Sequence, residues 1–391
     1  MSDLPQPHEL STVLTETSAW LIGPARKSLS PEAIAAGLID RLVAAGIPLL
    51  RVRLGQRVQN PMIGAWGVIW TRDGGTEQYT VQRGVLGTTA YKGSPFEHVI
   101  TRRASFRQRL DQLDPARDHE VLFEQAAAGA TDYIAIPIEY GDGSIQSGAF
   151  TTDRPGGYSP SEIALIDGLA PAIAAAMEPA AMRHSTTSLL EVYLGSGPAN
   201  RVVHGAFLRG QTSEMDAAVL VTDLRGFTGL SERLAPGDLL DRLGGYFEAV
   251  VDAVHVEGGD VLKFVGDGVL SVFPAENGGR QDACMRAARS VGRAFAKNAL
   301  GDNLPFVAAL HAGPVVYGNI GSLDRLDFTV VGPTVNYVSR LETAAKQLEK
   351  KAVCSQEVAS LLPGTSVADL GLHPLKGISG PQRIFELMAD V

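Results

Sequence analysis

The chain has 391 residues, of which 45% are hydrophobic and 20% charged, which is the composition of folded domains rather than of a disordered protein. Its length is sufficient for two or three domains. The formal net charge of −9 argues against non-specific nucleic-acid binding as the main activity. The two cysteines, Cys284 and Cys354, do not have the spacing of a metal site and indicate a reducing compartment.

Neither a membrane span nor a secretory leader is predicted from the sequence. No apolar run approaches the ~18 residues that suggest a transmembrane helix. The N-terminal segment Met-Ser-Asp-Leu-Pro-Gln-Pro has neither the basic stretch nor the apolar core of a signal peptide. We therefore expect a cytoplasmic protein with no membrane span and no nucleic-acid partner.

The N-terminal half alternates helical patterns with short strand-like runs. A helix is predicted over residues 30–46, with Ser30 as N-cap, Pro31 in the first turn and Gly46 as its stop signal. A long apolar helix is predicted from Ser159 to about Met177. Between them lie a short helix at 96–100 and strand-like runs at 49–54, 65–71, 77–81, 133–140 and 147–152.

This order of elements resembles that of GAF-type sensor domains, and residues 155–166, Pro-Gly-Gly-Tyr-Ser-Pro-Ser-Glu-Ile-Ala-Leu-Ile, are its most suggestive part. The resemblance implies an antiparallel sheet with helices over residues 30–180, after an N-terminal arm of residues 1–29. It also implies a small-molecule or protein ligand, which the sequence does not identify. Four aromatic residues on strands are candidates to line a pocket, although plain core is the commoner role: Trp66, Trp70, Tyr79 and Tyr133.

Residues 181–214 are predicted to form a helical linker. An apolar helical pattern covers residues 188–194 and 199–210, and Gly195-Ser-Gly-Pro198 interrupts it as a joint would. Two interpretations stay open for this segment, which either transmits a signal between domains or only packs.

Two short motifs place a carboxylate at the end of an apolar strand. Val219–Thr222 is a predicted strand that ends at Asp223, and Gly266-Asp267-Gly268 is the predicted turn of a hairpin. Two aspartates on neighbouring strands can share Mg²⁺, which takes oxygen ligands and keeps substrate phosphates in its shell. For either aspartate alone, simple closure of a turn is about equally well supported.

A third segment, Phe328-Thr-Val-Val-Gly-Pro-Thr-Val-Asn-Tyr-Val-Ser-Arg340, follows these motifs. Together the three resemble the class III nucleotidyl cyclase catalytic domain over about residues 215–391. The resemblance implies an α/β (α+β) fold of the ferredoxin-like, palm type. It also implies conversion of ATP to 3′,5′-cyclic AMP and pyrophosphate with two Mg²⁺ or Mn²⁺ ions per site.

The same resemblance assigns catalytic roles to four residues. Asp223 and Asp267 would bind the metal ions, Asn336 would orient the ribose, and Arg340 would stabilise the transition state. An arginine suits that role because its planar fork of donors neutralises developing charge on a phosphoryl group. One departure from the common family pattern is Pro333, where many relatives have Asp; it precedes a helix, where proline is tolerated.

Lys263 and Thr329 match the positions that read the purine. Lysine carries only donors and a threonine hydroxyl can accept, which fits the ring nitrogen and the amino group of adenine. Guanine presents the reverse edge, and guanylate-specific relatives typically have an acid at the lysine position, so Lys263 favours ATP. A guanylate cyclase, or a catalytically silent sensor and dimerisation protein, is the alternative.

Other substrate contacts are implied for Phe227 and Thr228, which follow Asp223, and for Arg383, the candidate triphosphate-binding cation. Lys376 competes with Arg383 for that role. In the family, the metal aspartates come from one chain and the base-reading, Asn and Arg groups come from another. The resemblance therefore implies a homodimer with shared active sites.

Overall fold

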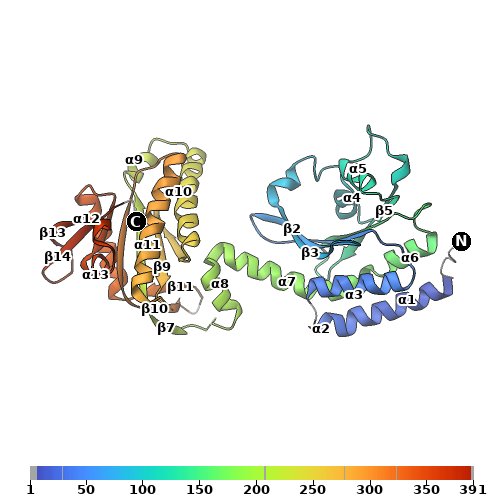
Figure 1. The fold of residues 1–391 in the computed structure, drawn as a ribbon, viewed down its shortest axis with the longest axis horizontal. Coiled ribbons are helices and arrows are strands. Elements are labelled where there is room, and N and C mark those ends of the chain that lie inside the picture. Colours follow the sequence, from blue (N-terminus) through green and yellow to red (C-terminus); the bar gives the residue numbers. More distant parts are fainter. Residues whose placement is uncertain (1–6, 29, 207, 277, 323, 389–391) are drawn as a thin grey trace. The chain divides into compact units, whose positions relative to one another are not determined.

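The computed structural model describes residues 7–28, 30–206, 208–276, 278–322 and 324–388 (Figure 1). The chain divides into two compact units, residues 1–189 and 190–391.

The N-terminal unit is built on a six-stranded antiparallel sheet with the order β3-β2-β1-β6-β5-β4. Its strands are β1 (Arg51–Arg57), β2 (Ile63–Thr71), β3 (Gly75–Gln82), β4 (Phe106–Arg109), β5 (Asp132–Glu139) and β6 (Ile145–Thr152). Its helices are α1 (Pro7–Trp20), α2 (Arg26–Ser28), α3 (Pro31–Ala44), α4 (Pro95–Arg102), α5 (Glu120–Ala127), α6 (Pro160–Gly168) and α7 (Ala170–Leu194).

Successive side chains along a strand point to opposite faces of this sheet, and a hydrophobic core covers each face. On β5, Ile134 and Ile136 pack with residues of α3, α6 and α7, whereas Tyr133 and Ala135 pack with residues of α4 and α5. The predicted starts of α3 and α6 are confirmed. Ser30 caps α3 through the amide of Ala33, and the cap of α6 is a reciprocal capping box.

Two segments of this unit differ from the sequence-based expectation. In the segment assigned to an N-terminal arm, residues 1–6 and 29 lie outside the described residues; residues 7–28 form α1, a π-helical turn and α2, and Leu10, Leu21 and Ala25 are buried in the core. The predicted long helix does not end near Met177, because α7 continues through Pro179. Packing of the buried alanines that follow outweighs the backbone hydrogen bond that this proline removes.

Among the described residues, one helical stretch, Pro160–Leu194, meets the length and composition criteria for a membrane span, although the sequence showed no uninterrupted apolar run. Half of its most apolar window is buried inside the structure. The core helix of a soluble protein meets the same criteria.

The C-terminal unit contains an eight-stranded sheet with the order β13-β14-β12-β10-β7-β9-β8, and β11 pairs with β10. The strands are β7 (Thr212–Leu224), β8 (Asp260–Val265), β9 (Gly268–Pro274), β10 (Phe306–Gly321), β11 (Leu326–Val331), β12 (Ala352–Ser355), β13 (Val367–Pro374) and β14 (Pro381–Leu387). The helices are α8 (Ser196–Val203), α9 (Phe227–Ser231), α10 (Pro236–Val256), α11 (Gly279–Leu300), α12 (Pro333–Gln347) and α13 (Gln356–Ala359).

Its central elements β7, α10, β8, β9, α11 and β10 follow one another as in a ferredoxin-like βαββαβ core. Ala218 and Leu220 of β7 pack with residues of α10 and α11, and Ala217 and Val219 pack on the opposite face with residues of α12. Figure 1 shows α10 and α11 side by side, as their contacts require. The expected α/β fold is confirmed, and it places the end of β7 beside the β8–β9 hairpin.

Candidate active site

Asp223 and Asp267 lie beside each other at one end of the sheet. Asp223 is the second-last residue of β7, and Asp267 lies in the turn between β8 and β9, with β9 paired to β7. A Cβ at Gly268 would lie 3.0 Å from Asp223 Oδ1, so the absence of a side chain there lets the turn approach the carboxylate. Burial and the charge of Asp223 raise the pKa of Asp267 above its usual value.

A lysine that the sequence analysis did not single out contacts this carboxylate pair. The Lys346 ammonium, on α12, contacts the Asp223 carboxylate and lies 2.8 Å from Glu342 Oε1. Burial lowers the pKa of Lys346, but the hydrogen bonds to Asp223 and Glu342 outweigh it, so the net shift is upward. Electrostatic attraction therefore holds the Lys346 ammonium beside the carboxylates of Asp223 and Glu342.

The donor set fits a hard divalent cation. Mg²⁺ and Mn²⁺ prefer carboxylate oxygens, and Mg²⁺ usually takes only one or two from the protein. Within the described ranges, no cluster of three or more His, Cys, Asp or Glu side chains is arranged as a metal site. Asp223 and Asp267 would thus hold the ions with further ligands from substrate phosphates and water.

The two predicted base-reading residues lie on β8 and β11, which contact each other. The Lys263 ammonium contacts the carboxylate of Asp327. Asp327 precedes Thr329 by two residues on β11, so both side chains belong to the same face of the strand. Thr329 is only 6% exposed, and its hydroxyl has no hydrogen-bond partner within the described part of the chain. An unpaired buried hydroxyl is available to a bound base.

Asn336 and Arg340 lie one turn apart on α12, and both are exposed. Neither side chain forms a hydrogen bond or ion pair with another described residue. The neighbouring face of α12 lines a cavity with Asp223 through Val335, Ser339 and Glu342. Within one chain, therefore, the Asn336–Arg340 face is turned away from the aspartates by roughly 100° around the helix.

The remaining predicted substrate contacts fall into two groups. Phe227 and Thr228 begin α9, directly after the Asp223 strand and the left-handed residue Gly226. Arg383 lies on β14, and its Nε is 3.7 Å from Asp369 Oδ2. In the sheet, β12 and β10 separate β14 from β7, so one chain does not bring Arg383 to the aspartates.

Lys376 lies exposed between β13 and β14, and the described residues offer it no ion-pair partner. The choice between Lys376 and Arg383 stays a prediction.

Three residues at the site were missed by sequence reasoning: Asp327, Glu342 and Lys346. Strand alternation around Thr329 would have indicated Asp327, because residues two apart share a face. The spacing of Glu342 and Lys346 is that of a helical i, i+4 ion pair. Nothing in that spacing shows that the ammonium also reaches Asp223, which requires α12 to pack across β7 and β10.

Comparison with known proteins matches the C-terminal region to a family. Residues 211–389 match the family model of the adenylate and guanylate cyclase catalytic domain. Over 148 residues, the chain is 30% identical to an adenylate cyclase of Anabaena cylindrica, a match that covers 35% of this chain and 29% of that protein. The chain thus spans less than a third of the length of this relative.

Two solved structures share 28% sequence identity with the chain. The adenylyl cyclase CyaB from P. aeruginosa aligns with a TM-score of 0.41, over 45% of this chain and 95% of its own. The guanylyl cyclase Cya2 aligns with a TM-score of 0.39, over 45% of this chain and 92% of its own.

The C-terminal unit thus has a βαββαβ core with a carboxylate pair at one end of its sheet. Residues 211–389 belong to the class III adenylate and guanylate cyclase family. Domains of this family use divalent metal ions, in agreement with the oxygen donors of Asp223 and Asp267. The family model covers both adenylate and guanylate cyclases, so it leaves the purine open.

Proposed function

We propose that the chain is an adenylate cyclase that converts ATP to 3′,5′-cyclic AMP and pyrophosphate. The observation that carries the choice of base is the pair formed by Lys263 and Thr329. The Lys263 ammonium can donate a hydrogen bond, and the unpaired buried hydroxyl of Thr329 can accept one. This arrangement of donor and acceptor matches adenine, whose ring nitrogen accepts and whose amino group donates. It does not match guanine, which presents the reverse arrangement.

The residues of the site fit a direct displacement. Metal ions held by Asp223 and Asp267 would lower the pKa of the ribose 3′-hydroxyl and neutralise the phosphates. The 3′-oxygen loses its proton to solvent and attacks the α-phosphorus, while the bond from that phosphorus to the bridging oxygen breaks and pyrophosphate leaves. Asn336 orients the ribose, and Arg340 neutralises charge that develops on the phosphoryl oxygens.

The working unit in this proposal is a homodimer with two shared sites. Support comes from the exposed Asn336 and Arg340, which lie on a different face of α12 from the one that borders Asp223. A second copy of the chain would supply Asn336 and Arg340 opposite the aspartates, and two-fold symmetry would form two such sites.

We further propose that the N-terminal unit is a GAF-like sensor and that the protein is cytoplasmic. The order of its antiparallel strands and the helices on both sheet faces support a sensor of this type. The two unpaired buried cysteines suit a reducing compartment.

The test of the proposed reaction is an assay of the purified full chain with Mg²⁺ or Mn²⁺ and either ATP or GTP. Cyclic AMP and pyrophosphate should form from ATP, with much less cyclic GMP from GTP. Asp223→Ala and Asp267→Ala should each abolish turnover with an unchanged circular dichroism spectrum, because each removes a metal ligand. Preferred use of GTP would identify a guanylate cyclase instead, and wild-type activity in either variant would refute the metal assignment.

A further inference from the structure

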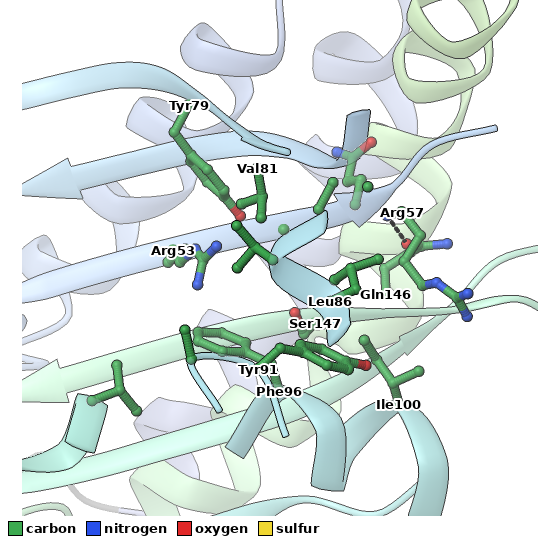
Figure 2. A pocket seen from close by; sticks show the side chains of 17 residues that line it. Arg53, Arg57, Tyr79, Val81, Leu86, Tyr91, Phe96, Ile100, Gln146 and Ser147 are labelled. Atoms are coloured by element: carbon green, nitrogen blue, oxygen red, sulfur yellow. Dashed lines mark hydrogen bonds between the residues drawn. The ribbon is translucent and has the colours of Figure 1, made fainter. Parts of the chain in front are cut away.

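The N-terminal unit contains a pocket with a cavity volume of about 160 Å³, and none of the candidate catalytic residues lines it. Strands β1, β2, β3 and β6 form one side of it, and the segment from the 3₁₀ turn Arg83–Gly87 to α4 covers the other (Figure 2). Glycines at positions 55 and 64 make the sheet side hollow. A Cβ at Gly64 would overlap Leu86, and one at Gly55 would lie 2.5 Å from the Tyr79 hydroxyl oxygen.

Arg53 supplies a positive charge in the same wall. Its guanidinium carbon lies 4.3 Å from the ring centroid of Tyr79 and 4.2 Å from that of Phe96, and Figure 2 shows it between the two rings. Its Nε is buried without a hydrogen-bond partner, and the described structure gives Arg53 no ion pair. The residues lining the cavity include a second arginine, Arg57, and no acid.

The rest of the wall is apolar, with Val81, Val85, Leu86 and Ile100 among the lining residues. A cavity of about 150 Å³ holds a molecule the size of benzene. The space is thus suited to a single ring or a short aliphatic chain, and it is too small for a nucleotide.

We propose that this cavity binds a small organic carboxylate with an apolar body of about one aromatic ring. The carboxylate accepts hydrogen bonds from the Arg53 guanidinium, whose fork of donors matches its two oxygens. The apolar walls surround the body. Stacking on two rings holds the guanidinium in place before binding, which reduces the entropy lost on binding.

This carboxylate site rests on the proposed sensor role and names the class of ligand for it. A binding measurement tests the site and requires neither nucleotide nor metal. Failure of cyclase activity would leave the binding result unaffected, and failure of binding would leave the cyclase assay unaffected.

The experiment titrates the full chain with benzoate, phenylacetate and hexanoate by calorimetry, and with benzyl alcohol and benzylamine as neutral and cationic molecules of similar size. At least one carboxylate should bind, and benzyl alcohol and benzylamine should bind at least about tenfold more weakly. Inorganic phosphate tests for an anion site without an apolar requirement and should not compete.

Arg53→Met keeps an unbranched stem between the rings and removes the charge, so it should weaken carboxylate binding at least about tenfold. Arg102→Met, at the exposed end of α4, is the matched control and should bind as wild type does. The proposal is overturned if no carboxylate binds, if benzyl alcohol or phosphate binds as tightly as the best carboxylate, or if a folded Arg53→Met retains full affinity. The comparison of probes on the wild-type chain decides the matter even if that variant does not fold.

Discussion

Lys346 changes the electrostatics of the candidate catalytic site. Its ammonium contacts Asp223 and neutralises part of the negative charge that Asp223, Asp267 and Glu342 bring together. A metal ion at the aspartates would compete with this ammonium for the same carboxylate. The Lys346 ammonium thus lies where a divalent cation bound to Asp223 would also be attracted.

Lys346→Met should bind divalent metal more tightly than the wild type, because the competing ammonium is gone. We expect the apparent dissociation constant for Mn²⁺, measured by calorimetry, to fall by about tenfold, and the metal-free variant to unfold at a lower temperature. Lys351→Met, an exposed neighbour, is the control and should leave both quantities unchanged. Equal or weaker Mn²⁺ binding in Lys346→Met would show that the ammonium does not compete.

Lys263→Glu tests the choice of base. Removal of a buried hydrogen-bonding partner costs ~1–3 kcal/mol, so the preference for ATP over GTP should fall by roughly tenfold to over a hundredfold. The new carboxylate would also face Asp327 and repel it. The measurement is kcat/KM for both nucleotides, and an unchanged ATP:GTP ratio would remove Lys263 from the base-reading role.

At the residue scale, sequence reasoning located the carboxylates through their strand ends, and the structure places Asp223 and Asp267 beside each other. It did not locate Asp327 or Lys346, because each acts through a partner distant in sequence. The contact from Lys346 to Asp223 spans 123 residues. Local patterns carry no information about such pairs.

Among the secondary-structure elements, α8 is attached to the strand that carries Lys263. The amide of Gly197 donates to the carboxylate of Asp260, the first residue of β8. Arg201 of α8 lies 4.6 Å over the ring of Tyr317, and Asn319 Nδ2 donates to the carbonyl of Ala206 at 2.5 Å. The end of the predicted linker is therefore packed against the catalytic unit.

Gly197→Ala should disturb this attachment, because a Cβ at that position would overlap the Asp260 carboxylate. Overpacking of this kind typically costs ~1–3 kcal/mol, so the catalytic unit should unfold at a lower temperature, and turnover should fall as β8 shifts. Gly364→Ala, where a Cβ would meet no atom within 4 Å, is the control. Unchanged stability and turnover in Gly197→Ala would mean that α8 does not constrain β8.

Helix starts were predictable because they depend on adjacent residues: Ser30 with Pro31 at α3, and Ser159 with Glu162 at α6. The length of each helix was not predictable in this way. The burial of α1 in the N-terminal core and the continuation of α7 past Pro179 depend on packing against elements far along the chain.

At the scale of the whole molecule, the chain joins a unit with an arginine-lined cavity to a cyclase catalytic domain. The order of these two regions was predictable from motifs, because the short catalytic motifs occur only in the C-terminal half. The chemistry of the cavity was not predictable, because it arises from Arg53, Tyr79 and Phe96, which lie on separate elements that fold together.

The central claim is an active site shared between two copies, and subunit complementation tests it most directly. Asp223→Ala and Arg340→Ala should each be inactive alone. Mixed in equal amounts under conditions that exchange subunits, they should recover about a quarter of wild-type activity, because half of the dimers are mixed and each mixed dimer holds one intact site of two. No recovery in a mixture shown to contain mixed dimers, or full activity in a verified monomer, would contradict the account.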